Sequence, residues 1–294
     1  MNISSVQATL EVKCEATLGE CPVWDEQNQL LYWVDILSGK LFRYDPVRQD
    51  LSIFEIGEHL GSFALREERG AILAMKTGFY YYDFEKKQSS LITDPEKNLP
   101  NNRFNDGKCD PKGRFWAGTL SYDLNQGAGS LYCLDKHGQA ILKASGFTIP
   151  NGMAWEPVSK KFYLIDSPER CVYSFEYDED GSLHKRTVVI KLEEDFGMPD
   201  GMTIDNENKL WIALYNGFKV IRVDPVRGDI LFEISLPVPQ VTSCTFGGAD
   251  LNEIYITTAR EHMSDEDIRE APLSGSLFKA ILPFKGQPAT KFAG

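Results

Sequence analysis

Six polar side chains recur along this chain at intervals that suggest one shared site. The intervals lie between 42 and 49 residues, and the positions are Glu20, Ser62, Asn105, Asn151, Asp200 and Ser243. Taken singly, each is explained as a polar residue that begins a strand after a turn. Two carboxylates and two carboxamides that converge within a few ångströms, however, repel one another and lack partners unless a cation lies among them. The set therefore predicts a cation site.

The donor types narrow the choice of ion. Hard oxygen ligands suit Ca²⁺, Mg²⁺ or Mn²⁺, and such sites also accept Zn²⁺ or Fe²⁺. None of the four histidines, at positions 59, 137, 184 and 262, occupies one of the six positions. This argues against a zinc site with three histidine ligands and against a Ser-His-Asp triad.

The elements that must position these residues form a repeat. Each polar residue begins a short β-rich segment, and a second apolar run follows it at residues 31–35, 71–75, 115–118, 162–166, 210–213 and 254–257. A third run comes next, and in five of the six units it closes on an acid, as at Asp45 and Asp224. A period in the forties with four short strands per unit is typical of a β-propeller blade.

We therefore predict one six-bladed, all-β propeller over residues 1–294, with four antiparallel strands per blade. Residues 8–14 also indicate a strand, which would complete the last blade and close the ring. In a propeller the first strand of each blade lines the central channel, so the six polar positions should form a ring at one mouth. A pair of β-sandwiches is the alternative, but nothing marks a linker or a composition shift near the middle of the chain.

The composition limits the classes of partner. The 294 residues are 42% hydrophobic and 25% charged, which is typical of a globular protein, and the net charge of −12 disfavours nucleic acid and anionic membranes. The sequence shows no secretory leader and no apolar run of the roughly 18 residues that span a bilayer. We expect a cytoplasmic protein with no obligate protein partner and with its six cysteines reduced and mostly buried, because no Cys-x-x-Cys pair occurs.

Four motifs carry a resemblance that covers nearly the whole chain. They are LGECPVW at residues 18–24, NRFNDGK at 102–108, PNGMAW at 150–155 and PDGM at 199–202. With these motifs in this order, the chain resembles the family of senescence marker protein (regucalcin), gluconolactonases and luciferin-regenerating enzyme. The resemblance implies one divalent metal ion held by Glu20, Asn151 and Asp200, with Arg103 and Asn105 contacting the hydroxyls of a sugar lactone.

The third blade departs from the family pattern. Many members that cleave sugar lactones have a second acid after an Ala-Gly-Thr sequence, and here that stretch continues as Leu120-Ser121-Tyr122-Asp123. Asp123 is the candidate for this substrate-binding acid, with Tyr122 beside it. Two long loops, at residues 120–129 and 258–274, should flank the same mouth. The second should contain a short helix with Ser264 as its cap and acids in its first turn. His262 in the same loop is expected to be solvated, with substrate contact as its alternative role.

The implied reaction assigns one further role. A lactone is an ester, and its hydrolysis needs a polarised carbonyl and an activated water. A carboxylate at the edge of the ion can accept the proton of that water, which makes Asp200 the candidate general base; pure ligation is its alternative role. Two other functions stay open, a calcium-binding regulatory protein of regucalcin type without significant turnover and a propeller that serves as a protein-interaction platform.

Overall fold

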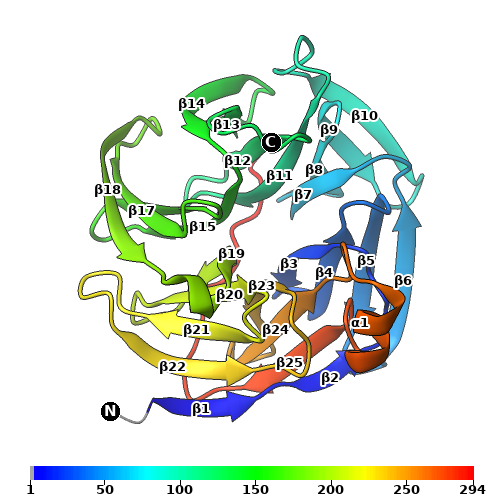
Figure 1. Ribbon diagram of the computed structural model, residues 1–294. Helices are drawn as coiled ribbons and strands as arrows, with labels where there is room; N and C mark the ends of the chain where they lie inside the picture. The colour runs from blue at the N-terminus through cyan, green and yellow to red at the C-terminus, as the bar shows by residue number, and fades with distance from the viewer. Residues whose placement is uncertain (1–2) are drawn as a thin grey trace.

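The computed structural model describes residues 3–294, and its strands form six sheets arranged around a central channel (Figure 1). Each sheet contains four antiparallel strands that follow one another in the sequence, apart from strands contributed by the N-terminal segment. The predicted six-bladed propeller is therefore confirmed, and the pair of β-sandwiches is excluded.

The blades are numbered in chain order, and in each the first strand lines the channel. Blade 1 contains β3 (Gly19–Asp25), β4 (Leu30–Asp35), β5 (Lys40–Asp45) and β6 (Asp50–Glu55). Blade 2 contains β7 (Leu60–Leu65), β8 (Ala71–Met75), β9 (Gly78–Asp83) and β10 (Gln88–Thr93). Blade 3 contains β11 (Asn102–Cys109), β12 (Phe115–Ser121), β13 (Gly129–Leu134) and β14 (Ala140–Phe147).

The second half of the chain repeats this order. Blade 4 contains β15 (Pro150–Glu156), β16 (Lys161–Asp166), β17 (Cys171–Tyr177) and β18 (Leu183–Lys191). Blade 5 contains β19 (Met198–Ile204), β20 (Leu210–Tyr215), β21 (Lys219–Val223) and β22 (Ile230–Ser235). Blade 6 contains β23 (Val241–Gly247), β24 (Glu253–Thr258) and β25 (Leu277–Ile281).

The N-terminal segment closes the ring in two steps. Strand β2 (Thr9–Val12) pairs antiparallel with β25 and supplies the fourth strand of blade 6, as predicted from residues 8–14. Strand β1 (Ser4–Gln7), which was not predicted, pairs parallel with β22 at the outer edge of blade 5. The segment therefore joins two neighbouring blades along the outside of the propeller, as Figure 1 shows.

The acids that recur in the sequence shape the turns of the blades. Asp45, Asp83, Asp135 and Asp224 each end a third strand or follow it, and each carboxylate accepts hydrogen bonds from backbone N–H groups two to four residues later. Such side-chain contacts fix a tight turn. Asp205 plays a similar part between β19 and β20, and it also accepts hydrogen bonds from the Trp211 indole and the Arg222 guanidinium.

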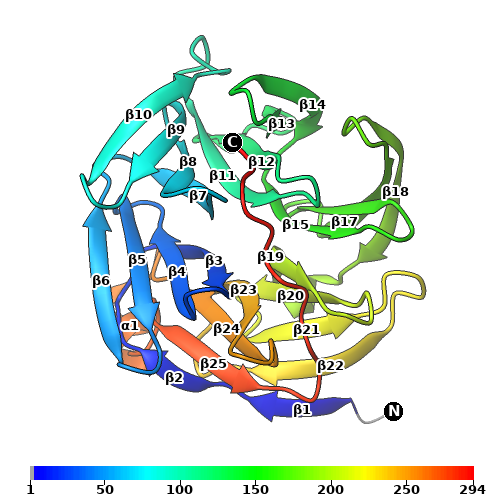
Figure 2. The same ribbon diagram turned by 180° about the vertical axis from the view of Figure 1, so that it is seen from behind.

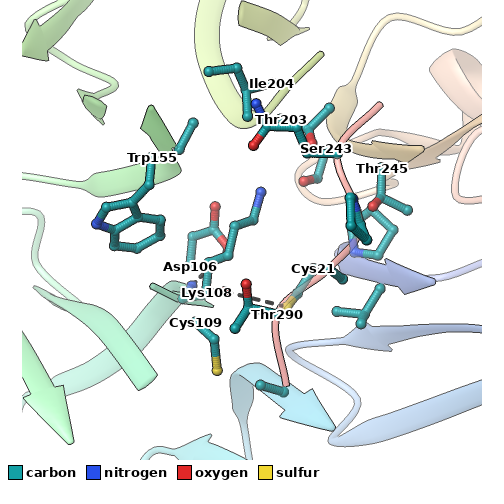
Figure 3. A pocket seen from close by; sticks show the side chains of 18 of the residues that line it. Cys21, Asp106, Lys108, Cys109, Trp155, Thr203, Ile204, Ser243, Thr245 and Thr290 are labelled. Atoms are coloured by element: carbon teal, nitrogen blue, oxygen red, sulfur yellow. Dashed lines mark hydrogen bonds between the residues drawn. The ribbon is translucent and has the colours of Figure 1, made fainter. Parts of the chain in front are cut away.

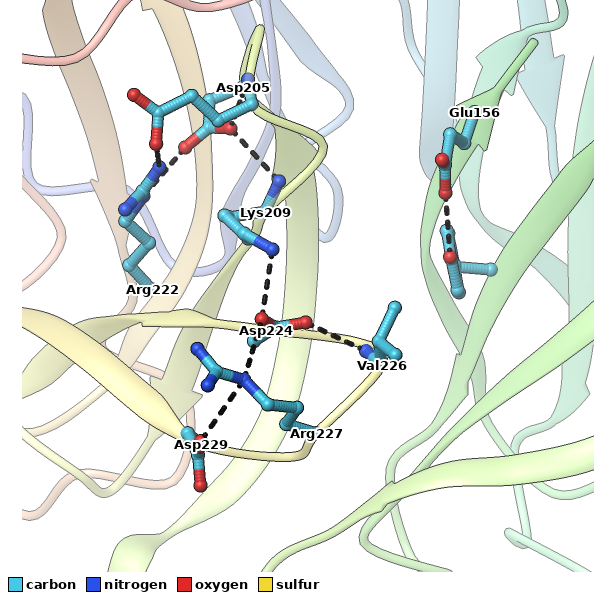
Figure 4. Close-up of polar contacts among 10 residues, drawn as sticks. Glu156, Asp205, Lys209, Arg222, Asp224, Val226, Arg227 and Asp229 are labelled. Atoms are coloured by element: carbon cyan, nitrogen blue, oxygen red, sulfur yellow. Dashed lines mark hydrogen bonds and ion pairs between the residues drawn. The ribbon is translucent and has the colours of Figure 1, made fainter. Parts of the chain in front are cut away.

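Asp224 is the centre of a small charge network in blade 5 (Figure 4). It accepts a 2.9 Å hydrogen bond from Lys209 Nζ and a 3.3 Å hydrogen bond from Arg227 Nε. Burial by itself would raise the pKa of Asp224, but these bonds and the one from the Val226 N–H outweigh it and lower the pKa to about 2. The carboxylate therefore stabilises the fold whenever it is ionised.

Asp224→Asn should lower the free energy of unfolding at pH 7 by about 1 to 2 kcal/mol. Because the pKa in the fold is below the ordinary value of 3.8, this contribution is complete above pH 5 and is lost as the pH falls towards 2. Urea unfolding at several pH values measures it, with Asp50→Asn, at an exposed position outside this network, as the control. An equal difference between wild type and variant at pH 7 and pH 3 would contradict the account.

Two short helices and a C-terminal segment complete the chain. The 3-10 helix η1 (Glu194–Phe196) precedes β19, and α1 (Asp265–Glu270) lies in the predicted long loop. Ser264 caps α1 as predicted, and Asp267 completes a reciprocal cap that was not predicted. Residues 283–294 run across one end of the channel, on the face of the propeller that is turned to the viewer in Figure 2. Within residues 3–294, no helix is both long enough and apolar enough to cross a membrane.

Candidate functional site

Breaks in strand register turn the ring side chains towards the channel. The pairing of the first strand with the second shifts between Phe104 and Gly107, between Pro150 and Met153, and between Pro199 and Met202. Comparable shifts occur in the other three blades. Such bulges re-aim side chains and are common beside functional sites. All six predicted ring residues are buried, with the exposed fraction of each between 0% and 8%.

The ring brings Asn151 and Asp200 into direct contact. The Asn151 amide nitrogen donates to Asp200 Oδ1 and, at 3.1 Å, to Ser167 Oγ. Both donor hydrogens of the amide are thus used, and Asn151 Oδ1 is buried with no hydrogen-bond partner among residues 3–294. An orphaned buried carbonyl oxygen costs free energy unless something else satisfies it. Asn151 Oδ1 is therefore a free oxygen donor next to a carboxylate.

Neither ring acid forms an ion pair within residues 3–294, although the charge of Arg103 acts weakly on both. Burial raises the pKa of Glu20 well above its usual range, and the charges of Asp200 and then Asp106 raise it further. Burial also raises the pKa of Asp200, and the charge of Asp106 raises it further. The hydrogen bond from Asn151 lowers this pKa but does not outweigh those two effects. A cation close to both carboxylates would reverse these shifts.

These residues fit a divalent cation. Glu20 and Asp200 supply charged oxygens, and Asn151 Oδ1 supplies a neutral one that has no other partner. Within the described residues, no three His, Cys, Asp or Glu side chains converge as metal ligands. A site here depends on the carboxamide, in keeping with the hard-oxygen donor set predicted from the sequence.

Two glycines let the first strands of blades 4, 5 and 6 approach closely at the ring. A Cβ on Gly152 would lie 2.5 Å from the Met202 backbone nitrogen, and a Cβ on Gly201 would lie 2.0 Å from Ser243 Oγ. Any side chain at either position would push neighbouring strands apart. The glycine that follows each of Asn151 and Asp200 thus holds the two ligands within reach of one another.

Arg103 and Asn105 form one unit on β11. Arg103 Nη1 donates to Asn105 Oδ1 at 2.9 Å and to the Phe104 carbonyl at 3.0 Å, and the Asn105 amide donates to the Pro150 carbonyl at 3.2 Å. Arg103 is only 8% exposed, so it is not a solvated arginine of an entry loop. Asn105 has its oxygen and its amide nitrogen engaged by protein, and it ties Arg103 to blade 4.

Among the described residues, the other predicted positions make no hydrogen bond to Asn151 or Asp200. Asp123 is exposed on the loop after β12 and accepts a 2.6 Å hydrogen bond from the Asn101 amide. His262 is 84% exposed and contacts the neighbouring Glu261. Ser62 is buried with its hydroxyl unpaired, and Ser243 faces a cavity on the other side of the ring. Asn151 therefore contacts Asp200 directly, the charges of Asp200 and Arg103 both act on Glu20, and Asp123 is exposed on its loop.

That cavity lies beside the C-terminal segment and has a volume of about 300 Å³ (Figure 3). Its walls come from the first strands of the blades, and residues 287–290 of the C-terminal segment cover it. Asp106 and Lys108 point into it, and Lys108 Nζ donates to the Met202 carbonyl at 2.7 Å. Asp106 thus belongs to the cavity, while its charge also acts on Glu20 and Asp200.

Sequence reasoning missed four residues around the site. They are Ser167, which anchors the Asn151 amide, Asp106, and the rim residues His59 and Glu261. Asp106 directly follows the ring residue Asn105 where the strand register shifts. Two adjacent polar residues at this point of the sequence could have indicated it. The other three lie in loops outside the repeated segments, and no spacing marks them.

Fold and site together define a class of protein, the six-bladed propellers with a buried, oxygen-rich centre in the channel. The sequence model of one protein family, described as the SMP-30/Gluconolactonase/LRE-like region, matches residues 18–260 of this chain. The chain therefore belongs to this family. The resemblance found in the four sequence motifs is thereby confirmed.

Individual relatives match over almost the whole length. Regucalcin of Xenopus laevis is 38% identical over 99% of this chain and 100% of its own. The 6-deoxy-6-sulfogluconolactonase of Pseudomonas putida is 37% identical over 96% of this chain and 97% of its own length. Among solved structures, a calcium-binding regucalcin from Agrobacterium tumefaciens superimposes with a TM-score of 0.93 at 25% identity over 99% of both chains.

Proposed function

We propose that this protein hydrolyses a sugar lactone at the ring, with a divalent cation held by Glu20, Asn151 and Asp200 and with Asp200 as the general base. The observation that carries the proposal is the buried contact between Asn151 and Asp200, which leaves one amide oxygen unpartnered beside two acids. The family membership and the lactonase named among the relatives support the choice of substrate class.

The residues of this chain take distinct parts in the reaction. When bound, the cation supplies Lewis acidity that polarises the lactone carbonyl. Asp200 Oδ1 is held by the Asn151 amide, and Asp200 Oδ2 takes no hydrogen bond from the described residues, so this oxygen is free to accept a proton. As water adds to the carbonyl carbon, its proton passes to Asp200. The ring C–O bond then breaks, and Asp200 returns the proton to the ring oxygen, which becomes a hydroxyl of the open acid while the Asp200 carboxylate is regenerated.

Arg103 contributes binding rather than proton transfer. Its guanidinium is anchored through Nη1, which leaves Nη2 and Nε directed at no protein acceptor among the described residues. These remaining N–H groups suit the carbonyl or hydroxyl oxygens of a sugar lactone. Asn105 acts through Arg103, because its side-chain oxygen accepts the guanidinium hydrogen bond.

A substrate screen tests the proposal. Purified protein, first depleted of metal and then reloaded with Ca²⁺, Mg²⁺, Mn²⁺, Zn²⁺ or Fe²⁺, is offered a panel of aldonolactones, and acid release is measured. We expect hydrolysis of at least one sugar lactone above the spontaneous rate, with a rate that depends on the ion. No hydrolysis with any lactone and any ion would refute the proposal.

Arg103→Ala should raise KM for the best lactone by about 10 to 100-fold and leave kcat within a fewfold, because the guanidinium binds ground state and transition state alike. Steady-state kinetics measure both constants. Arg186→Ala is the control, since that guanidinium stacks on Tyr173 at 3.8 Å in the outer part of blade 4. Unchanged kinetics for the Arg103 variant would remove this residue from the site.

A further inference from the structure

Tyr122 occupies a fixed position at the rim of the ring. Its backbone N–H donates to the Asn101 carbonyl at 2.9 Å, directly beyond the point where β11 and β12 pair at Asn102 and Ser121. Its hydroxyl lies 2.7 Å from His59 Nδ1, just before the first strand of blade 2. Tyr122 therefore bridges blades 2 and 3 on the face of the propeller where the ring opens.

The ring of Tyr122 is held from a second side. Lys76, in the turn between β8 and β9, places its ammonium 5.5 Å from the centre of the phenol ring, and the rings of Tyr122 and His59 meet at 60°. A cation over an aromatic face is attractive. Two contacts from blade 2 thus restrict the side chain to one orientation, which is what a recognition group needs.

Arg103 shares this neighbourhood. Arg103 pairs with Leu120 across β11 and β12, two residues before Tyr122. Burial lowers the pKa of Arg103, and of the charges that oppose this effect, Tyr122 acts most strongly. Burial likewise lowers the pKa of His59, and the positive charges of Arg103 and Lys76 lower it further. The neutral imidazole is therefore favoured. A neutral His59 can hold the phenol without adding charge at the rim.

We propose that Tyr122, positioned by His59, determines substrate specificity by hydrogen bonding a hydroxyl of the lactone next to Arg103. This inference rests on the proposed function and deepens it, because it names the part of the substrate that is read. A site built to hydrogen bond a hydroxyl discriminates strongly against an analogue that lacks it. Tyr122 should therefore favour hydroxylated lactones over unsubstituted ones.

The test compares two substrates of equal ring size, the best aldono-1,5-lactone and δ-valerolactone, which has no hydroxyl groups. Tyr122→Phe should lower kcat/KM for the aldonolactone by about tenfold, mainly through KM, which corresponds to about 1.4 kcal/mol. For δ-valerolactone it should stay within twofold. His59→Gln should shift the ratio in the same direction by a smaller factor. Tyr163→Phe, which removes a 2.9 Å hydrogen bond to Glu156 in blade 4, should leave the ratio unchanged.

Each outcome separates the hypotheses. Equal losses on both lactones would make Tyr122 a structural residue, and no loss on either would remove it from recognition. In both cases wild-type turnover would leave the lactonase proposal standing. A wild-type protein that hydrolyses neither lactone nor any other aldonolactone would refute the lactonase proposal and this inference together. Thermal unfolding of each variant checks that the fold is retained.

Discussion

Asp200→Asn is expected to lower kcat for lactone hydrolysis by about 10² to 10⁴, the usual share of general base catalysis. The substitution keeps an oxygen ligand of nearly the same shape, and the amide oxygen can still accept the hydrogen bond from Asn151. It removes the proton acceptor. Metal affinity should fall by a smaller factor than kcat, because two of the three donors are unaltered.

Asn151→Ala supplies the matched control for this prediction. Asn151 is a neutral donor with no basic function, and its Oδ1 has no hydrogen-bond partner in the part of the chain that the structure describes. Its loss should weaken metal binding first, and saturating metal should restore much of kcat. Metal titrations beside turnover distinguish the two variants. Near wild-type turnover of metal-saturated Asp200→Asn would eliminate the base assignment and leave ligation as the role of Asp200.

Much of the architecture was predictable because every blade has the same structural requirements, which repeat in the sequence. Each blade needs an apolar first and second strand and a polar turn, so the segments recur with their acids in register, and the ring positions follow from aligning them. Asp45 and Asp224 show this, since carboxylates predicted from the repeat close the turns between outer strands. The cap at Ser264 was predictable because a capping residue and its acids are adjacent in sequence.

Contacts between distant segments were not predictable in the same way. Strand β1 is short, with only Val6 half-buried, so neither periodicity nor hydrophobicity marked it, and its parallel pairing depends on where blade 5 ends. The same holds for the C-terminal segment across the channel. The pair Tyr122 and His59 joins two loops that are 63 residues apart, and only the closed ring brings them together.

Exhaustive chelation should abolish lactone hydrolysis. Without the ion, the carbonyl loses its polarising group, and the buried acids Glu20 and Asp200 have raised pKa values that favour their protonated forms, so that Asp200 loses its capacity as a base. Different ions should restore activity to different degrees, because the ion tunes how strongly the carbonyl is polarised. Glu20→Gln should need a higher metal concentration for the same activity.

One titration therefore tests the central claim that the ring is a metal-dependent lactonase centre. Chelated protein is titrated with Mn²⁺, and bound metal and the initial rate of aldonolactone hydrolysis are measured on the same samples. The account predicts one ion per chain, with the rate rising from the background in proportion to occupancy, and weaker binding in Asn151→Ala. Full activity in metal-free protein, or metal binding that Asn151→Ala leaves unchanged, would contradict it.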